Sequence, residues 1–242
     1  MQRILITGAS GAIGRSIARQ LAASGASLYL HYQQGEKRAE KLCRELAETY
    51  VAQDFSCVQA NLAQPDGVAR LFEQIELSVD GLVYACGKSD VGLIQEVTSQ
   101  QLTEAIQLML TSPFQLVQKM IRPMIAAKSG RIVFISSIWG LTGASMEVLY
   151  SMVKGGQNSL VKALAKETAP SGITVNAVAP GAVQTPMLDR FSSEDLDLVR
   201  EDIPMGRLGQ PDEIAALVQF LMSADASYIS GQVISANGAW YC

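Results

Sequence analysis

The chain has 242 residues, of which 48% are apolar, and a formal net charge of −4 at pH 7. This length and composition predict one domain over residues 1–242 with a well-buried core. The acidic balance argues against a nucleic-acid partner, whose binding depends on clustered Lys and Arg, and no uninterrupted apolar stretch reaches the length that spans a membrane.

Short apolar runs alternate with longer amphipathic stretches along the whole chain. The strand-like runs are RILIT, SLYLH, FSCVQA, GLVYA, GRIVFIS, GITVNAVA and GQVISA, and several of them are almost continuously apolar. Such runs are expected where helices cover both faces of a parallel sheet. The order predicts an α/β fold, a doubly wound parallel sheet of the Rossmann type with about seven strands and helices on both faces.

A glycine-rich turn follows the first strand-like run, in the segment TGASGAIGRSIARQLAASGA. Glycines permit a tight turn, and the helix that follows begins with unpaired backbone N–H groups and the positive end of its dipole. A pyrophosphate can bind there without a basic side chain. A glycine-rich turn after a strand is also common as an ordinary loop, so this segment alone does not identify a cofactor site.

A serine, a tyrosine and a lysine follow the fifth strand-like run. Ser137 stands at the end of that run, and Tyr150 and Lys154 lie one helical turn apart. An ammonium group at that spacing favours the phenolate, so we expect Lys154 to lower the pKa of Tyr150 from its usual value of about 10. The pair can then act as a general acid without a histidine. The single histidine, His31, ends a strand-like run without an evident partner, and we expect a packing or rim position for it.

The late part of the chain interrupts the alternation. The least regular segment is PMLDRFSSEDLDLVREDIPMGRLG, and we expect a substrate lid at about residues 184–208. The closing residues, NGAWYC, are apolar for a terminus, and termini fray unless they are packed. They are expected either to meet another subunit or to fold back onto their own domain.

These features together resemble the short-chain dehydrogenase/reductase family over essentially the whole chain. The resemblance rests on Thr7-Gly8, the run to Gly14, YACG after the fourth strand, Ser137, Tyr150, Lys154 and PGAVQTPM, all in order. It implies a reductase in which Tyr150 is the general acid, Lys154 is its electrostatic partner and a ribose ligand, and Ser137 binds the carbonyl oxygen. No metal is implied.

The resemblance also implies a nicotinamide cofactor, held by residues near the carboxyl ends of the strands. These are Thr7, Gly8, Ser10, Ile13, Gly14, Tyr32, Asn61, Leu62, Ala85, Gly87, Tyr150, Lys154, Pro180, Gly181, Val183 and Thr185. The family's middle glycine is Ala12 here, and its N-N-A-G after the fourth strand is YACG. Neither change removes the backbone groups that make the contacts.

The end of the second strand bears on the choice of cofactor. Tyr32 stands where NAD-preferring relatives commonly carry an acidic side chain for the ribose 2′-hydroxyl. With no carboxylate to repel a 2′-phosphate, and with Lys37 and Arg38 nearby, NADP(H) is favoured. The two basic residues are equally well explained as the solvated start of a helix, so the missing acid is the stronger indication.

One position departs from the family in a way that concerns turnover. Met109 replaces the Asn that usually supports a water for proton relay near the lysine. Either the relay is rebuilt through a backbone carbonyl and water, or turnover does not depend on it. The substitution also leaves open a non-enzymatic NADP(H)-binding regulatory protein, against which the intact Ser, Tyr and Lys argue.

Within the family the chain resembles two groups of reductases that act on protein-borne ketones. IPMGRLGQPDEIA is similar to 3-oxoacyl carrier-protein reductases, whereas SSIWG, TGAS, EVLYS, VKGG and NGAWYC look like the 5-aminopentanone reductases that modify elongation factor P. The basic patch that meets an acyl carrier protein is half present, with Lys128 and Ser171 at its two positions. The resemblance therefore favours elongation factor P over acyl carrier protein as the partner.

Two residues are candidates for substrate contact, Trp139 and Glu147. The aminopentanone group carries an amine that is cationic at neutral pH, whereas a 3-oxoacyl chain ends in a methyl group. Glu147, one turn before Tyr150, could bind that ammonium group. The alternative is a solvated residue at a helix start, stabilised by the dipole.

Assembly and cell compartment follow from weaker indications. Relatives are commonly tetramers, and the resemblance implies a homotetramer in which the long helices around Leu110 and Val161 pair and the last strand meets its counterpart. The four cysteines, at positions 43, 57, 86 and 242, contain no C-x-x-C pair, so neither a zinc site nor a disulfide framework is predicted. We therefore expect a cytoplasmic protein with reduced thiols.

Overall fold

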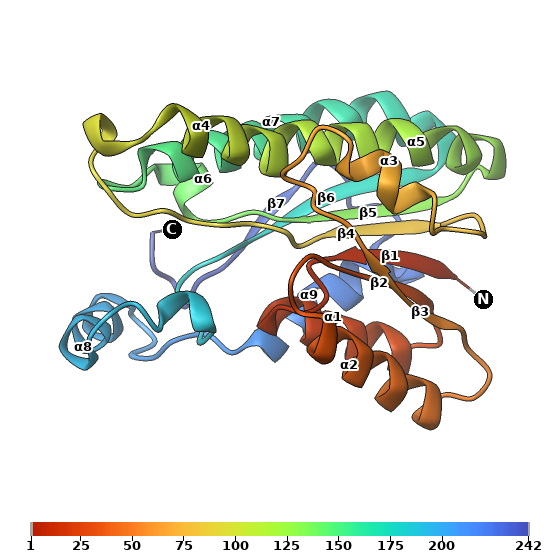
Figure 1. Ribbon diagram of the computed structural model, residues 1–242, viewed down its shortest axis with the longest axis horizontal. Helices are drawn as coiled ribbons and strands as arrows, with labels where there is room; N and C mark the ends of the chain where they lie inside the picture. Colours follow the sequence, from red (N-terminus) through yellow and green to blue (C-terminus); the bar gives the residue numbers. More distant parts are fainter. Residues whose placement is uncertain (1, 242) are drawn as a thin grey trace.

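The computed structural model describes residues 2–241 and contains one parallel sheet of seven strands, in the order β3-β2-β1-β4-β5-β6-β7 (Figure 1). The strands are β1 (Arg3–Thr7), β2 (Ser27–Tyr32), β3 (Phe55–Gln59), β4 (Gly81–Tyr84), β5 (Gly130–Ile135), β6 (Ile173–Pro180) and β7 (Val233–Ala236). All seven predicted runs form strands. The predicted doubly wound sheet in a single domain is confirmed.

The helices connect consecutive strands and cover both faces of the sheet. The α-helices are α1 (Ala12–Ala23), α2 (Glu36–Thr49), α3 (Gly67–Phe72), α4 (Ser99–Ile106), α5 (Ser112–Ala127), α6 (Trp139–Thr142), α7 (Val148–Thr168), α8 (Ser193–Asp202) and α9 (Pro211–Met222). A π-helix, η2 (Gln107–Thr111), joins α4 to α5. Short 3₁₀ turns are η1 (Ile94–Glu96), η3 (Ala169–Ser171), η4 (Pro186–Leu188) and η5 (Ala224–Ala226).

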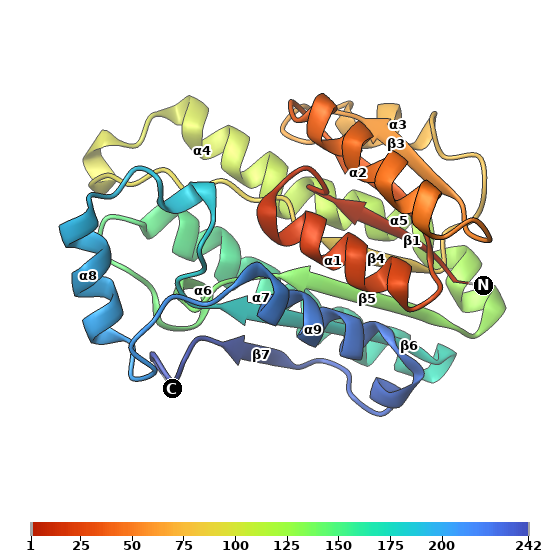
Figure 2. The same ribbon diagram turned by 90° about the horizontal axis from the view of Figure 1, so that it is seen from below.

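The core consists of two layers, one on each face of the sheet. Along β1, Ile4 and Ile6 pack with α1, α2 and α9, whereas Leu5 points to the opposite layer with α3, α5 and α7. Figures 1 and 2 show these two groups of helices on opposite sides of the sheet. Because side chains alternate along a strand, a strand buried on both faces must be apolar at every position, which explains the unbroken apolar runs.

The strand order indicates where a ligand-binding crevice is expected. The chain turns back at β1 and β4, where β1 lies between β2 and β4. In open parallel sheets a crevice forms beyond the carboxyl ends of the strands at such a reversal. α8 projects beyond this same edge of the sheet, apart from the two helical layers (Figure 2).

The two residues that mark the predicted tetramer helices contact their own chain. Val161 is fully buried, and Leu110 is half-buried and packs towards Gly156 of α7. The pairing of the helices around them stays a prediction. The aromatic side chains of the closing segment fold back onto their own domain, where Trp240 packs against Trp139. Cys242 lies outside the described residues.

No helix within residues 2–241 combines the length and the apolar character needed to cross a membrane. The three cysteines in this range, Cys43, Cys57 and Cys86, are free thiols.

Candidate active site

Two adjoining cavities run along the carboxyl edge of the sheet and share Ala85 and Gly87, which follow β4. The first extends over the turn after β1 and the end of β2. The second extends over the ends of β5 and β6 to the segment around α8. Together they form one elongated groove.

The turn after β1 has the geometry of an anion-binding site. Gly8 has φ of +70°, and a Cβ atom on Gly14 would lie 2.2 Å from the carbonyl oxygen of Gly8, so α1 packs directly on the turn. α1 begins after Gly11 with no side-chain cap, which leaves its first backbone N–H groups for a ligand. A bound phosphate would fit here, as the sequence predicts.

The buried side chain of His31 is hydrogen-bonded to this turn. Its Nδ1 accepts a hydrogen bond from the backbone N–H of Gly8 at 3.2 Å, and its Nε2 lies 3.1 Å from the carbonyl oxygen of Ala60. Since the N–H only donates and the carbonyl only accepts, the ring is the neutral tautomer with its proton on Nε2. Burial lowers the pKa of His31 to about 4. The expectation of an unpartnered residue is therefore wrong.

This pKa makes the fold sensitive to acid. The unfolded chain takes up a proton on His31 near pH 6.5 and the folded chain only near pH 4, so stability falls as pH decreases through that window. The full shift corresponds to about 3 kcal/mol of unfolding free energy. We expect urea unfolding between pH 7 and 4.5 to show a steeper loss of stability for the natural chain than for His31→Asn, and parallel curves would contradict this.

The cavity near the end of β2 contains one of the two basic residues named from the sequence. Arg38 lines it, together with Ser10 and Gly35, whereas Lys37 does not. Tyr32 is 8% exposed, does not line the cavity, and its hydroxyl lies 3.3 Å from Glu36. The guanidinium of Arg38 is therefore the group placed to meet a 2′-phosphate.

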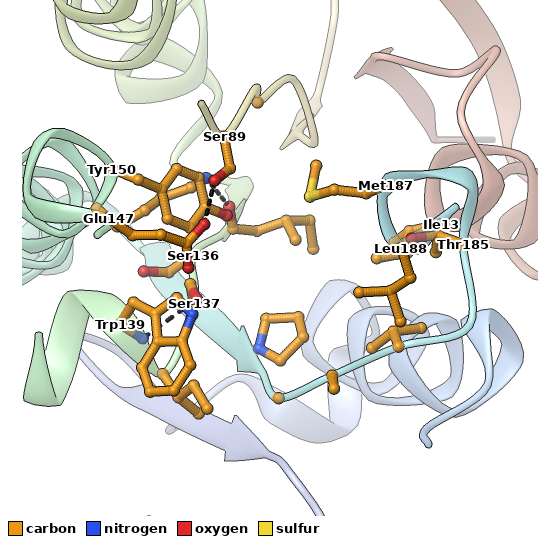
Figure 3. A pocket seen from close by; sticks show the side chains of 18 of the residues that line it. Ile13, Ser89, Ser136, Ser137, Trp139, Glu147, Tyr150, Thr185, Met187 and Leu188 are labelled. Carbon is orange, nitrogen blue, oxygen red and sulfur yellow. Dashed lines mark hydrogen bonds between the residues drawn. The ribbon is translucent and has the colours of Figure 1, made fainter. Parts of the chain in front are cut away.

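The three predicted catalytic residues converge in the other cavity (Figure 3). Ser137 follows β5, and Tyr150 and Lys154 project from α7. The hydroxyl groups of Ser137 and Tyr150 are hydrogen-bonded to each other. The backbone N–H of Trp139 donates to Oγ of Ser137 at 3.2 Å, which orients the serine. Two hydroxyl groups thus face the place where a carbonyl oxygen would bind.

The pKa of Tyr150 was predicted to fall below its ordinary value, whereas in the structure it is raised. Burial and the carboxylate of Glu147 raise it above its ordinary value, while the hydrogen bond from Ser137 and the charge of Arg190 act in the opposite direction. Nζ of Lys154 lies 5.6 Å from the centre of the Tyr150 ring, and burial outweighs it. The phenol is therefore fully protonated at neutral pH, the form in which it can donate a proton.

Lys154 is 2% exposed, and backbone and side-chain acceptors hold its ammonium group. Nζ donates to the carbonyl oxygen of Ile135 at 2.7 Å and to Oε1 of Gln157 at 3.1 Å. Burial lowers the pKa of Lys154 to about 8. The carbonyl oxygen of Met109 accepts from Nε2 of Gln157 at 2.7 Å. The Met109 carbonyl is thus bonded to a side chain whose part in the site no sequence motif indicated, and the two alternatives for the proton relay stay open.

Glu147 lies in the same cavity and has partners. Its carboxylate accepts a hydrogen bond from the hydroxyl of Ser89 and lies 3.5 Å from a guanidinium nitrogen of Arg190. Glu147 stands at the start of α7, as the alternative expected, but only 14% of its side chain is exposed, so it is not a solvated residue. Arg190 also donates to the carbonyl oxygen of Ser89 at 2.8 Å, which ties the segment before α8 to the loop after β4.

Trp139 and Trp240 form an aromatic wall of this cavity, and Tyr241 packs against both rings. The rings of Trp139 and Trp240 lie 5.3 Å apart, and those of Trp139 and Tyr241 lie 5.2 Å apart, both edge to face. Apolar side chains before and within α8 form the opposite side, as Figure 3 shows for Met187 and Leu188. The cavity therefore suits an apolar chain that leads to the Ser137 and Tyr150 hydroxyl groups.

Most of the predicted residues line one of the two cavities. Those that do are Gly8, Ser10, Ile13, Asn61, Leu62, Ala85, Gly87, Ser137, Trp139, Glu147, Tyr150, Lys154, Pro180, Gly181, Val183 and Thr185. Thr7, Gly14 and Tyr32 do not. The hydroxyl of Thr7 accepts from the backbone N–H of Ala85 at 3.1 Å. This bond connects the end of β1 to the loop after β4 that lines both cavities.

The positions expected to meet an acyl carrier protein lie far from this cavity in the same chain. Lys128 follows α5 and Ser171 ends η3, so both precede a strand and stand at the amino edge of the sheet. Ser137 and Pro180 stand at the opposite, carboxyl edge. In a single chain these two positions therefore do not flank the catalytic pocket.

Comparison with known proteins assigns this architecture to a group of oxidoreductases. A family model described as Enoyl-(Acyl carrier protein) reductase matches residues 8–239. The chain is 48% identical over 238 residues to "Uncharacterized oxidoreductase YmfI" of Bacillus subtilis (strain 168), which covers 98% of both chains. It is 39% identical over 240 residues to the 3-oxoacyl-[acyl-carrier-protein] reductase FabG of Aquifex aeolicus (strain VF5), covering 98% of this chain and 96% of the other.

A solved structure of similar fold holds a nicotinamide cofactor. The angucycline C-6 ketoreductase LanV with bound NADP superposes with a TM-score of 0.92 at 28% identity, covering 99% of this chain and 95% of the other. Trp240 and Tyr241 lie beyond the segment that the family model matches.

Proposed function

The chain belongs to the short-chain dehydrogenase/reductase family, and from this we propose that it is a carbonyl reductase that uses NADPH to reduce the 5-aminopentanone group on a modified lysine of elongation factor P to the alcohol. Its class is that of an NADP-dependent short-chain oxidoreductase. The observation that carries the proposed substrate is the pairing of a carboxylate, Glu147, with aromatic faces, Trp139 and Trp240, in the catalytic cavity.

The residues of the chain divide the chemistry of ketone reduction between them. NADPH, when bound, supplies the hydride for the carbonyl carbon. Ser137 and Tyr150 hold the carbonyl oxygen, and Tyr150 donates its proton to that oxygen as the alcohol forms, which leaves a phenolate. The buried ammonium group of Lys154 stabilises this anion and the cofactor ribose. Arg38 is the residue we assign to the 2′-phosphate of the cofactor.

The proposed substrate carries an ammonium group at neutral pH, and the cavity offers two kinds of group that bind one. Glu147 supplies a carboxylate close enough to Tyr150 to raise its pKa. The faces of Trp139 and Trp240 are electron-rich and attract cations. Arg190 already contacts Glu147 at 3.5 Å, a distance that is long for a charged hydrogen bond. A substrate ammonium group therefore competes with a weak partner.

A second candidate is the 3-oxoacyl-[acyl-carrier-protein] reductase of fatty-acid synthesis, with acyl carrier protein as the partner. The observation that favours it is the apolar side of the cavity, formed by Met187, Leu188 and Phe191, which suits an acyl chain. One observation counts against it: of the two positions expected to carry basic residues for an acyl carrier protein, Lys128 keeps its charge and Ser171 has none. A purely regulatory, non-enzymatic protein is a poor fit to a family of oxidoreductases.

The two candidate functions predict different substrate preferences in a steady-state assay. We expect NADPH oxidation with an N-acylated peptide that carries a 5-aminopentanone side chain to have a kcat/KM at least tenfold higher than with an acetoacetyl thioester, since a charge-assisted hydrogen bond of roughly 1.5–3 kcal/mol is available only to the first. A clear preference for the thioester would favour the carrier-protein candidate instead.

Glu147→Gln tests the carboxylate directly. The change keeps the shape and removes the charge, so KM for the amine-bearing ketone should rise by roughly tenfold or more, while a neutral ketone of equal length is almost unaffected. Glu194→Gln, the same change on the exposed start of α8, is the control and should alter neither KM. Equal effects of Glu147→Gln on both ketones would remove Glu147 from substrate recognition.

Three further parts of the proposal concern the surroundings of the site. Residues 184–208 act as a substrate lid, because this segment contributes Met187, Phe191 and Leu196 to the cavity and is fastened to the loop after β4 by Arg190. The protein acts in the cytoplasm. It assembles as a homotetramer, for which the half-exposed Phe114 of α5 and Met152 of α7 provide apolar surface.

A further inference from the structure

Gln157 is a fully buried polar residue on α7, one turn after Lys154, and both ends of its amide are bonded. Oε1 accepts from Nζ of Lys154 at 3.1 Å, and Nε2 donates to the carbonyl oxygen of Met109 at 2.7 Å. An ammonium group can only donate and a carbonyl oxygen can only accept. This orientation of the amide is therefore the one that satisfies both neighbours.

The acceptor for Gln157 lies in the π-helix between α4 and α5. Two carbonyl groups of η2 accept hydrogen bonds from side chains. Leu108 accepts from the hydroxyl of Tyr84, and Met109 accepts from Gln157. The amide of Gln157 is thus anchored on a neighbouring helix rather than on its own, and this anchoring fixes Oε1 in front of Lys154.

From these contacts we infer that Gln157 is a positioning residue for Lys154, whose neutral amide holds the buried ammonium group in place and sets how readily it keeps its proton. The inference rests on the proposed role of Lys154 beside Tyr150. The second acceptor of the ammonium group, the carbonyl oxygen of Ile135 at 2.7 Å, belongs to the end of β5 and is fixed by the sheet. Gln157 is the contact that a side-chain substitution can change.

The charges around Lys154 are few, which makes a neutral acceptor important. The titratable groups that face it are the phenol of Tyr150 on α7 and the thiol of Cys86 after β4, both of which are neutral at pH 7. Among the groups with an identified effect on Lys154 there is no carboxylate within the described chain. The ammonium charge of Lys154 is therefore stabilised by neutral hydrogen-bond acceptors and not by an ion pair.

Two substitutions of similar size should move Lys154 in opposite directions. Gln157→Met removes the acceptor, so the pKa of Lys154 should fall by about one unit, a tenfold loss of proton affinity. Gln157→Glu adds an anion at the same place, so the pKa should rise by about one unit or more. The alkaline limb of the pH profile of kcat/KM should follow in each case, towards lower pH for the first variant and higher pH for the second.

The pKa itself is measured by NMR titration of protein labelled with ¹⁵N at the lysine side chains, with the Lys154 resonance assigned by its absence in Lys154→Met. This readout does not depend on turnover, so it separates the inference from the proposed reaction. Displacements in opposite directions, with no ketone reduced, would support the role of Gln157 while the proposed function fails. An unchanged Lys154 pKa in a folded Gln157→Met protein would overturn the inference, even if Gln157→Glu fails to fold.

A matched control is Gln115→Met in α5. The Oε1 atom of Gln115 is buried and has no hydrogen-bond partner among the described residues, and its cavity is separate from the catalytic one. The substitution repeats the chemical change without touching Lys154. It should leave both the Lys154 titration and the pH profile in place, and a shift as large as that of Gln157→Met would mean that the effect is a general one of core packing.

Discussion

Replacing Lys154 with alanine should abolish nearly all turnover and also weaken NADPH binding. The substitution removes the one buried cation beside Tyr150 and leaves the Ile135 carbonyl and the Gln157 amide without their donor. Loss of a charged group that acts in both binding and chemistry should reduce kcat/KM by more than the roughly 10²–10⁴-fold typical of a single general acid. Fluorescence titration with NADPH should show a higher Kd.

Two further variants test whether the activity lost in Lys154→Ala is lost through the missing charge or through missing packing. Lys154→Met keeps the length of the side chain and should be almost as inactive as the alanine variant, because the charge is what the site requires. Lys162→Ala changes an exposed lysine on the same helix and should behave like the natural chain. If Lys154→Met retained a tenth or more of the activity, the electrostatic role of Lys154 would have to be abandoned.

Replacing Tyr150 with phenylalanine should remove most of the turnover and leave cofactor binding nearly intact. The change deletes one hydroxyl group and little volume, so α7 and the groove should keep their shape. General acid catalysis contributes about 10²–10⁴-fold, and a fall of that size in kcat is expected. The NADPH Kd, measured by the same titration, should change by less than about threefold, since the lysine contact remains.

Tyr228→Phe is the matched control for this change, because Tyr228 is fully exposed and distant from both cavities. The pH dependence adds a second test. Since burial and Glu147 raise the pKa of Tyr150 in the free protein, its proton is present throughout the neutral range, and reduction should not require a low pH. Retention of more than about a tenth of the activity in Tyr150→Phe would contradict the role of Tyr150 as the acid.

The fold was predictable because its strongest signal is local. Each central strand must be apolar on both faces, so runs such as GRIVFIS can be recognised as strands without knowledge of the tertiary structure. The convergence of Ser137 with Tyr150 was also predictable, since one follows a strand and the other opens the next long helix. The sequence named Tyr32, Lys37 and Arg38 near the end of the second strand but could not show which of them reaches the cavity. In the structure Arg38 lines it, and Tyr32 and Lys37 do not.

The electrostatics of the site could not be predicted from spacing alone. The expected fall in the pKa of Tyr150 assumed that a charge one turn away dominates, whereas burial and Glu147 raise the pKa. His31 and Gln157 were overlooked for a related reason. Their partners are backbone groups of Gly8, Ala60 and Met109, distant in sequence, and a sequence pattern carries no sign of which carbonyl or N–H a side chain will meet.

The most direct measurement of the proposed function is the mass of elongation factor P from cells that contain or lack this protein. Reduction of a ketone to an alcohol adds two hydrogens, so the factor from cells without the protein should be lighter by two hydrogens on the modified lysine. Complementation with the natural chain should restore the mass, whereas complementation with Tyr150→Phe should not. An unchanged mass in cells that lack the protein would contradict the proposed function.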